Sequence, residues 1–139
     1  MIFKSYILEE NFKSLDDLKI VLFYGENQGL KKEFKEKLKL ENKDNEILNL
    51  FQDEVITNQD ILVNEITNKS LFNEKKIIFI NEATDKILPL IEDSIDNIDN
   101  EKIFIFSDIL DKKSKLRNYL EKSAICGVTA CYQDNEITI

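Results

Sequence analysis

A pair of glycines follows the first long apolar run of the chain, at the position where nucleotide-binding α/β domains hold their phosphate loop. A working loop needs a glycine-rich turn, a lysine that meets the β- and γ-phosphates, and a serine or threonine hydroxyl for Mg²⁺. Here Gly25 and Gly29 are four residues apart rather than five, and Leu30 stands where the lysine is needed. Glu26 adds a negative charge, and the stretch contains no serine or threonine. We therefore interpret Gly25, Glu26, Asn27 and Gly29 as a degenerate phosphate loop.

The acidic half of such a site, which holds Mg²⁺ and polarises water, is also incomplete. The third apolar run ends in Asn81 and Glu82, and a single carboxylate beside an amide is a poor metal site. We interpret both residues as a strand end that caps the following helix. Asp108 and Asp111 follow the fourth run. We predict that they cap a helix starting near Lys112, because acidic residues complement the helix dipole there.

Histidine is absent from all 139 residues, which removes the commonest general acid or base and the commonest metal ligand. The two cysteines, Cys126 and Cys131, do not form a C-x-x-C motif and lie in an apolar stretch. We expect both to be buried, reduced thiols. The sequence therefore predicts no catalytic residue, no metal site and no cofactor.

The charge balance, 19 basic against 27 acidic residues, gives a net charge of −8. A domain that binds nucleic acid by itself needs a basic surface, so this balance disfavours that role and favours protein partners. We interpret the concentrated basic segment, residues 112–122, as a solvated helix face; contact with a phosphate backbone or an acidic partner is the alternative. No apolar run reaches the roughly 20 residues of a membrane helix. The acidic N-terminus lacks an export signal, so we expect a cytoplasmic protein.

Five short apolar runs recur along the chain, and amphipathic segments separate them. The first, third and fourth runs are continuously apolar, which is typical of parallel strands buried on both faces by helices. The five predicted strands are Lys19–Tyr24, Glu46–Phe51, Lys75–Ile80, Lys102–Phe106 and Ala124–Tyr132.

The segments between the runs place apolar residues three and four positions apart, the spacing of one helix face. Alternating strands and helices favour a three-layer α/β fold with right-handed crossovers. Near the N-terminus, Ile2–Tyr6 is a candidate edge strand, and Ser14–Leu18 is a candidate helical turn capped by Ser14. The predicted helices are Gln28–Leu40, Asn58–Thr67, Thr84–Ile98 with Pro89 in its first turn, and Lys112–Lys122.

The chain shows no repeat and no linker, so we expect residues 1–139 to form one domain. Residues 133–139 are predicted to form a polar turn that opens a further helix, with Asp134 or Asn135 as its N-cap. We therefore expect the domain to be a piece of a longer chain.

Leu71 and Phe72 stand side by side in a short polar connection, between the helix predicted for 58–67 and the third strand. One interpretation folds the pair inward to cover the sheet edge. The other lets it protrude as an anchor for a pocket on a partner, as aromatic hot spots do. Full burial of each side chain contributes about 1.5–3 kcal/mol in either case. The pattern by itself slightly favours the inward arrangement.

The order of these motifs resembles the N-terminal domain of the delta subunit of the bacterial DNA polymerase III clamp loader. The resemblance covers nearly the whole chain from Tyr6 onward. GEN and S-L-F are short motifs that are weak singly, but their order and spacing are specific. The matching stretches are strand KIVLFY, a GEN turn without a phosphate-loop lysine, S-L-F before strand KKIIFI, then FIFSDILDKKSKLRNYLEK and CYQDNE.

The resemblance implies a RecA-like, AAA+ domain with a five-stranded, mainly parallel sheet. Its strands would lie in the order fifth, first, fourth, third and second run. It also implies a subunit without ATP hydrolysis of its own, in a holoenzyme that is a DNA-directed DNA polymerase. Such a subunit binds the sliding clamp (beta) and helps to open the ring for loading onto primed DNA during replication. The implied partners are the clamp and the gamma/tau and delta-prime subunits, with DNA contacted only through the full assembly and no membrane.

By the same resemblance, Ser70, Leu71 and Phe72 are the clamp-binding residues, and the apolar pair enters a hydrophobic pocket of the clamp. This favours the outward arrangement of the pair. Two other functions stay open. One is a catalytically dead scaffold subunit of a different AAA+ assembly, and the other is an NTPase with an atypical phosphate loop.

Overall fold

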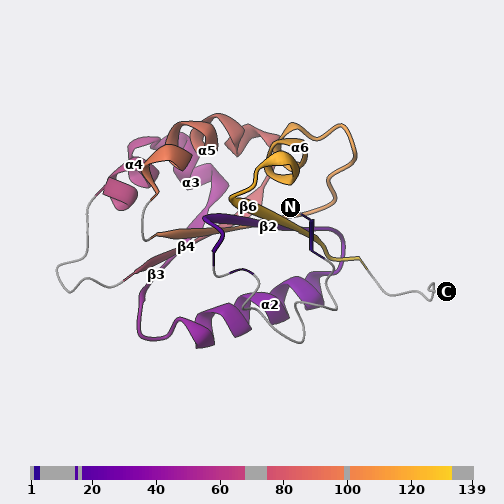
Figure 1. The fold of residues 1–139 in the computed structure, drawn as a ribbon, viewed down its shortest axis with the longest axis horizontal. Helices are drawn as coiled ribbons and strands as arrows, with labels where there is room; N and C mark the ends of the chain where they lie inside the picture. The colour runs from indigo at the N-terminus through magenta and orange to yellow at the C-terminus, as the bar shows by residue number, and fades with distance from the viewer. Residues whose placement is uncertain (1, 4–14, 16, 68–74, 99–100, 133–139) are drawn as a thin grey trace.

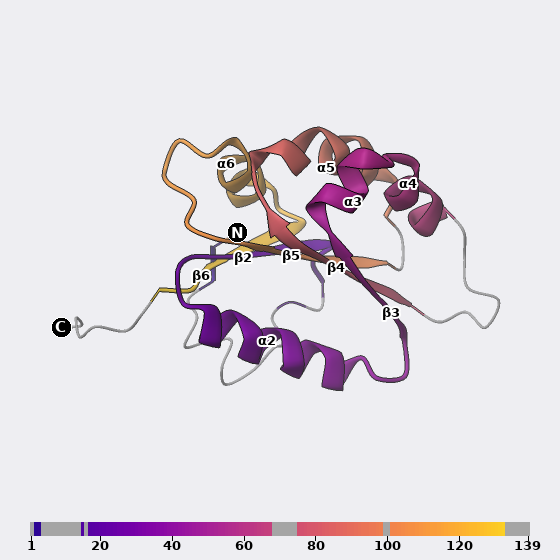
Figure 2. The same ribbon diagram turned by 180° about the vertical axis from the view of Figure 1, so that it is seen from behind.

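The computed structural model describes residues 2–3, 15, 17–67, 75–98 and 101–132. A sheet lies between one long helix on one face and several shorter helices on the other (Figure 1 and Figure 2). This confirms the predicted three-layer α/β fold. The helices are α2 (Gln28–Glu41) on the first face, and α3 (Gln52–Thr57), α4 (Asp60–Thr67), α5 (Leu88–Ser94) and α6 (Lys115–Lys122) on the second.

The sheet of the described residues has six strands, β1 (Ile2–Phe3), β2 (Ile20–Tyr24), β3 (Glu46–Phe51), β4 (Lys76–Ala83), β5 (Lys102–Ser107) and β6 (Cys126–Ala130). They are all parallel and lie in the order β1-β6-β2-β5-β4-β3. The order implied by the resemblance is therefore confirmed for five strands. The resemblance implies five strands, whereas the described sheet has six, because β1 pairs in parallel with β6 at the sheet edge.

The continuously apolar strands serve both faces of the sheet. In β2, Ile20 and Leu22 belong to the core under the shorter helices, whereas Val21 and Phe23 belong to the core under α2. Successive side chains point to opposite faces of a strand, so a strand covered on both faces must be apolar throughout. This is why the run carries no polar alternation.

The core under α2 is mainly aromatic. Phe34 of α2 is fully buried, and its ring centroid lies 5.4 Å from that of Phe23. Phe23 in turn stacks on Phe106 at 5.1 Å, and Phe79 stacks on Phe104 at 5.7 Å. These contacts fix α2 against β2, β4 and β5, and so fix the turn that precedes α2.

Both cysteines lie in the core as thiols and form no disulfide with each other. Cys126 is buried on the side of the shorter helices and Cys131 on the side of α2. Burial raises the pKa of the Cys126 thiol, which keeps it protonated. The prediction of buried, reduced thiols is confirmed.

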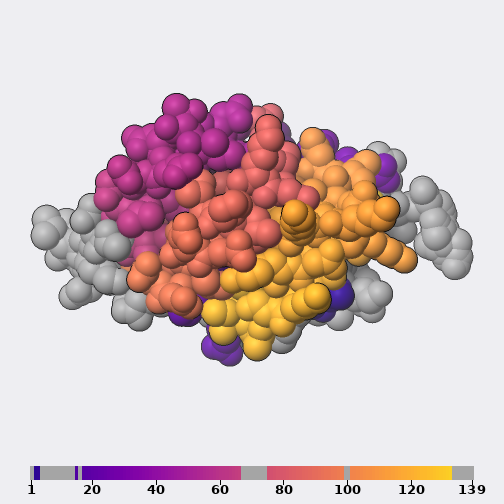
Figure 3. Space-filling model, turned by 90° about the horizontal axis from the view of Figure 1, so that it is seen from above, coloured from indigo at the N-terminus to yellow at the C-terminus, as the bar shows by residue number. Residues whose placement is uncertain are grey.

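The shorter helices differ from their predicted bounds. Helix α3 follows β3 directly and was not predicted, while the segment predicted as Thr84–Ile98 is a 3₁₀ turn, α5 and a second 3₁₀ turn. Pro89 lies in the first turn of α5, as predicted. Figure 3 looks down on this face, where the magenta, orange and yellow segments lie next to one another. No helix in the described part of the chain is long and apolar enough to cross a membrane.

The N-terminus of α6 is capped by Ser114 and Asp85, and the prediction that Asp108 and Asp111 cap it is wrong. Ser114 accepts a hydrogen bond from the backbone N–H of Arg117 at 3.2 Å. The Asp85 carboxylate accepts bonds from the Ser114 hydroxyl at 2.6 Å and from the first two amides of α6 at 3.2 and 3.3 Å. Asp111 instead accepts from the N–H of Lys113 in the preceding turn. The helix therefore begins at residue 115, three residues after the predicted start.

Replacing Asp85 with alanine is expected to destabilise the fold by about 1 kcal/mol near neutral pH, the usual cost of a lost helix cap. Burial raises the pKa of Asp85, but the hydrogen bonds from Ser114, Leu116 and Lys115 outweigh it, so the pKa is lowered overall. A lowered pKa gives stability that is present above the ordinary value near 4 and is lost as the pH falls through the folded value. Urea unfolding of both proteins near neutral pH and in acid checks this: their difference in free energy of unfolding should shrink as the pH falls through the folded pKa of Asp85. An equal cost at both pH values contradicts it.

Candidate functional site

The turn at Gly25 brings two strand ends together and is not shaped as a phosphate cradle. Gly25 has a φ of +124°, and a Cβ atom there would lie 2.2 Å from the carbonyl oxygen of Cys131. Its N–H donates to the carbonyl of Asp108 at 3.0 Å. The glycine is therefore required by the close approach of the segment after β6.

Asn27 is engaged in internal hydrogen bonds through its backbone N–H and its side chain, so these groups are not available to an anion. Its side-chain oxygen accepts from the N–H of Leu30 at 3.0 Å, as an N-cap of α2. Its own N–H donates to the carbonyl of Cys131 at 2.9 Å, and its side-chain NH₂ donates to Tyr132. The helix begins at residue 28, so only three residues separate it from β2. Gly29 lies inside the first turn of α2 rather than in the loop.

Lys31 is the cation beside this turn, and the protein's own groups already bind it. Its side chain is almost fully buried. The ammonium donates to the carbonyl of Ser107 at 2.8 Å and lies 3.5 Å from the Asp108 carboxylate. Gln28 donates to the same carboxylate at 2.8 Å. The Gln28 bond lowers the pKa of Asp108, burial raises it, and the nearby Lys31 lowers it further, so the net shift is downward. Sequence reasoning missed this contact, because nothing in the pattern pairs residues so far apart in the chain.

Asn81 connects three elements, and the prediction that it caps the next helix is wrong. Its NH₂ group donates to the side chain of Asn49 and the carbonyl of Leu50, both at 2.9 Å, and its oxygen accepts from Lys35 of α2 at 2.6 Å. The following 3₁₀ turn is capped by Thr84 instead.

Glu82 lies in an irregular end of β4, which runs three residues beyond the predicted strand. Its φ is +55°, the left-handed region that is uncommon for a non-glycine residue. The register between β4 and β5 shifts between Ile80 and Ala83. This bulge turns the Glu82 side chain out to solvent, at the carboxyl edge of the sheet.

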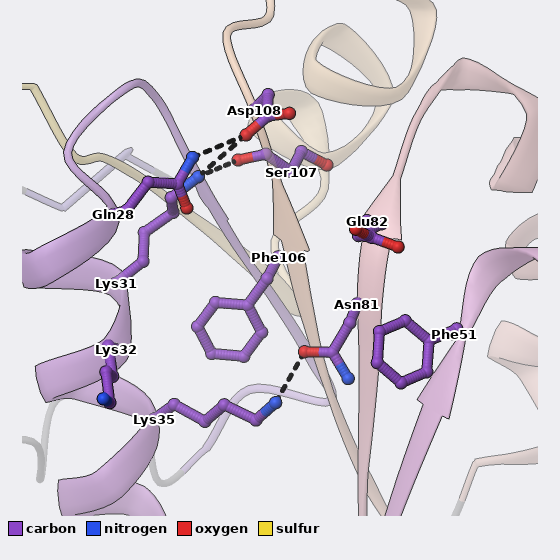
Figure 4. A pocket seen from close by; sticks show the side chains of 10 residues that line it. All are labelled: Gln28, Lys31, Lys32, Lys35, Phe51, Asn81, Glu82, Phe106, Ser107 and Asp108. Carbon is purple, nitrogen blue, oxygen red and sulfur yellow. Dashed lines mark hydrogen bonds and ion pairs between the residues drawn. The ribbon is translucent and has the colours of Figure 1, made fainter.

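A pocket of about 310 Å³ lies at this carboxyl edge, between α2 and the ends of β3, β4 and β5. Figure 4 shows Lys31, Lys32 and Lys35 along one side, with Phe51 and Phe106 facing the space. Ligands of open α/β sheets bind at this edge. The remaining lining residues are Gln28, Asn81, Glu82, Ser107 and Asp108.

The predicted clamp-binding residues Ser70, Leu71 and Phe72 lie outside the described residues, as do Ser14 and residues 133–139. The elements on either side of 68–74 are tied together. The buried ammonium of Lys76 donates to the backbone carbonyl of Glu65 at 2.8 Å and pairs with its carboxylate at 3.1 Å. This contact links the last turn of α4 to the start of β4.

The basic segment is only partly a solvated helix face. Arg117 packs inward: its guanidinium lies 4.9 Å from the centroid of the Tyr24 ring, donates to the carbonyl of Leu110 and pairs with Glu121 at 2.9 Å. Burial is the main reason that the pKa of Tyr24 is raised to about 12, opposed by Arg117. The lysines of the segment, at positions 112, 113, 115 and 122, are exposed as predicted.

No protein-family model matches the chain, and no curated protein matches it. Among solved structures it is similar to the DNA clamp loader delta protein (YqeN) of Bacillus subtilis. The TM-score is 0.69 and the sequence identity 14%, over 93% of this chain. The match covers 42% of that protein, so the chain spans less than half of its length. At this identity the likeness shows the fold alone, which is the three-layer α/β fold described above.

Proposed function

We propose that the chain is the first domain of a clamp-loader subunit of the delta type, within a longer, cytoplasmic protein. On this proposal it binds the ring-shaped sliding clamp and helps to hold one interface of the ring open for loading onto primed DNA. The fold likeness to the clamp loader delta protein of Bacillus subtilis carries the proposal. The order of the GEN and S-L-F motifs in the sequence supports it.

The proposal gives this domain no ATP hydrolysis of its own. Asn27 caps α2 with its own side chain, and Lys31 is held by Ser107 and Asp108. A triphosphate would have to displace these internal contacts and would meet the carboxylate of Asp108. ATP hydrolysis is therefore assigned to the gamma/tau partners, with delta-prime completing the assembly.

The clamp anchor in this proposal is the apolar pair Leu71 and Phe72, preceded by Ser70. The pair fills a hydrophobic pocket next to one interface of the ring. A ligand shifts a conformational equilibrium only by its different affinity for the two states. Opening therefore comes from contacts that are better made in the open ring. The Lys76–Glu65 contact supports this arrangement, because it holds the elements on both sides of the anchor in a fixed relation.

The direct test is binding of the purified domain to a bacterial sliding clamp by surface plasmon resonance. The Leu71→Ala/Phe72→Ala variant is expected to lose more than about 2 kcal/mol of binding free energy, the cost of removing hot-spot residues. A matched control is Leu40→Ala/Ile109→Ala. It removes two apolar side chains that are 69% and 62% exposed elsewhere on the surface, and it should bind as the wild type does.

Circular dichroism must first show that all three proteins are folded. Loss of binding in the 71/72 variant alone supports the clamp anchor. Equal binding by all three proteins places the clamp contact elsewhere on the domain. No binding by the wild type contradicts the proposal and leaves a scaffold role in another AAA+ assembly.

A further inference from the structure

The pocket between α2 and the carboxyl edge of the sheet has an excess of positive charge. Three lysines and two carboxylates line it, and Lys31 and Asp108 are already paired. What remains is Lys32 and Lys35 against the exposed carboxylate of Glu82. The lining therefore carries one net positive charge, which suits a ligand with a single negative charge.

Lys35 is the cation best placed to receive such a ligand. Its ammonium lies 5.7 Å from the ring centroids of both Phe79 and Phe106, and it donates to the amide oxygen of Asn81 at 2.6 Å. No carboxylate within ion-pair distance is found for it among the described residues. Burial lowers the pKa of Lys35, and the neighbouring Lys39 lowers it further. An ammonium that has already lost part of its water gains more from an anionic partner than one in bulk solvent.

The Ser107 hydroxyl is a second, independent feature of the same pocket. The residue is 1% exposed, and its hydroxyl has no hydrogen-bond partner in the part of the chain that the structure describes. In Figure 4 it points from the end of β5 toward β4. Buried hydroxyl groups are normally paired, so Ser107 leaves an unpaired polar group at the edge of the pocket.

Two aromatic side chains give the pocket an apolar wall. Phe106 is buried, and Phe51 at the end of β3 is 41% exposed although it is a large apolar side chain. Figure 4 shows the two rings on either side of Asn81. A flat apolar group that lies across Asn81 would contact both rings and cover Phe51. The volume of about 310 Å³ is at the small end of the range for ligand pockets, which suits a molecule of one or two rings.

We propose that this pocket binds a small aromatic monocarboxylate, with the carboxylate between Lys35 and Lys32 and the ring against Phe51 and Phe106. The carboxylate accepts from the ammonium groups of both lysines. The Glu82 carboxylate at the rim disfavours ligands with several negative charges, such as a triphosphate. The site is separate from the proposed clamp anchor, because it lies at the carboxyl end of β4, whereas the anchor precedes the start of that strand in the sequence.

The test is an NMR titration of the ¹⁵N-labelled chain with indole-3-acetate, beside indole-3-acetamide and acetate. The acid is expected to bind with a Kd below about 1 mM and to shift amides of the pocket lining. The amide lacks the charge and acetate lacks the ring, so each should bind at least about tenfold more weakly.

Substitutions test whether the lysine of the pocket binds the acid. Lys35→Gln is expected to weaken binding of the acid at least about tenfold. Lys37→Gln is the matched control, because Lys37 lies on the same helix, pairs with Glu33 and does not line the pocket. The proposal is overturned if acid and amide bind alike, if Lys35→Gln binds as Lys37→Gln does, if Mg·ATP binds more tightly than the acid, or if no probe binds at all.

Discussion

The Gly25→Ala variant is expected to lose about 3–5 kcal/mol of its free energy of unfolding, a large share of the total for a domain of this size. Two costs add. The φ of +124° is one that L side chains rarely adopt, and the new Cβ would lie 2.2 Å from the carbonyl oxygen of Cys131. Relief requires moving backbone, since the contact atom belongs to the main chain. Urea unfolding followed by circular dichroism measures the loss.

Gly29→Ala is the internal control for this prediction. Gly29 lies in the first turn of α2, and a Cβ there would meet only the side chain of Asn27 at an ordinary 3.6 Å. Alanine is the better helix former, so this variant should be neutral or stabilised by up to about 1 kcal/mol. If both substitutions cost the same, the close approach of the strand ends at Gly25 is not what the position requires.

The second large effect is expected for Phe34→Ala, which should cost about 3–5 kcal/mol. Phe34 is fully buried in α2 and packs on Phe23, so its removal leaves a cavity under the sheet that the surrounding rings cannot fill. The midpoint of urea unfolding should fall sharply. Because α2 positions Lys31 and Lys35, binding at the carboxyl-edge pocket should weaken as well.

Phe51→Ala removes a ring of the same size from β3, where the side chain is 41% exposed. It should cost about 1 kcal/mol or less, as surface substitutions do. It should nevertheless weaken binding of indole-3-acetate, since Phe51 forms a wall of the pocket. A large loss of stability from Phe51→Ala, or a small one from Phe34→Ala, contradicts the described packing.

The sheet could be predicted because its signal is local. Lys102–Phe106 and Lys19–Tyr24 are apolar without alternation, and only strands covered on both faces require that. Helix α3 could not be predicted, because its six residues contribute only Val55 as a buried apolar side chain, too few to show a period. The strand order was available only through the resemblance, since the runs by themselves carry no information on which strands are neighbours.

The degenerate phosphate loop stays a prediction, made from the spacing of Gly25 and Gly29 and from Leu30, which directly follows Gly29. The residues that bind Lys31 and that cap α6 do not follow from any local pattern. Asp108 contacts Lys31, some 77 positions earlier in the chain, and Asp85 caps a helix about 30 positions later. Capping residues were therefore assigned to the nearest acidic side chains, and both assignments to α6 were wrong.

The internal pairing of Lys31 with Ser107 and Asp108 has a consequence for how the stability of the fold depends on nucleotide concentration. A domain that binds a nucleotide in its folded state gains stability with ligand concentration and loses it when the ligand is depleted. Here the protein's own residues make the contacts around the turn, and these intramolecular contacts do not depend on the concentration of a ligand. We therefore expect the folded fraction of this domain to be independent of the ATP concentration, at low and high ATP alike.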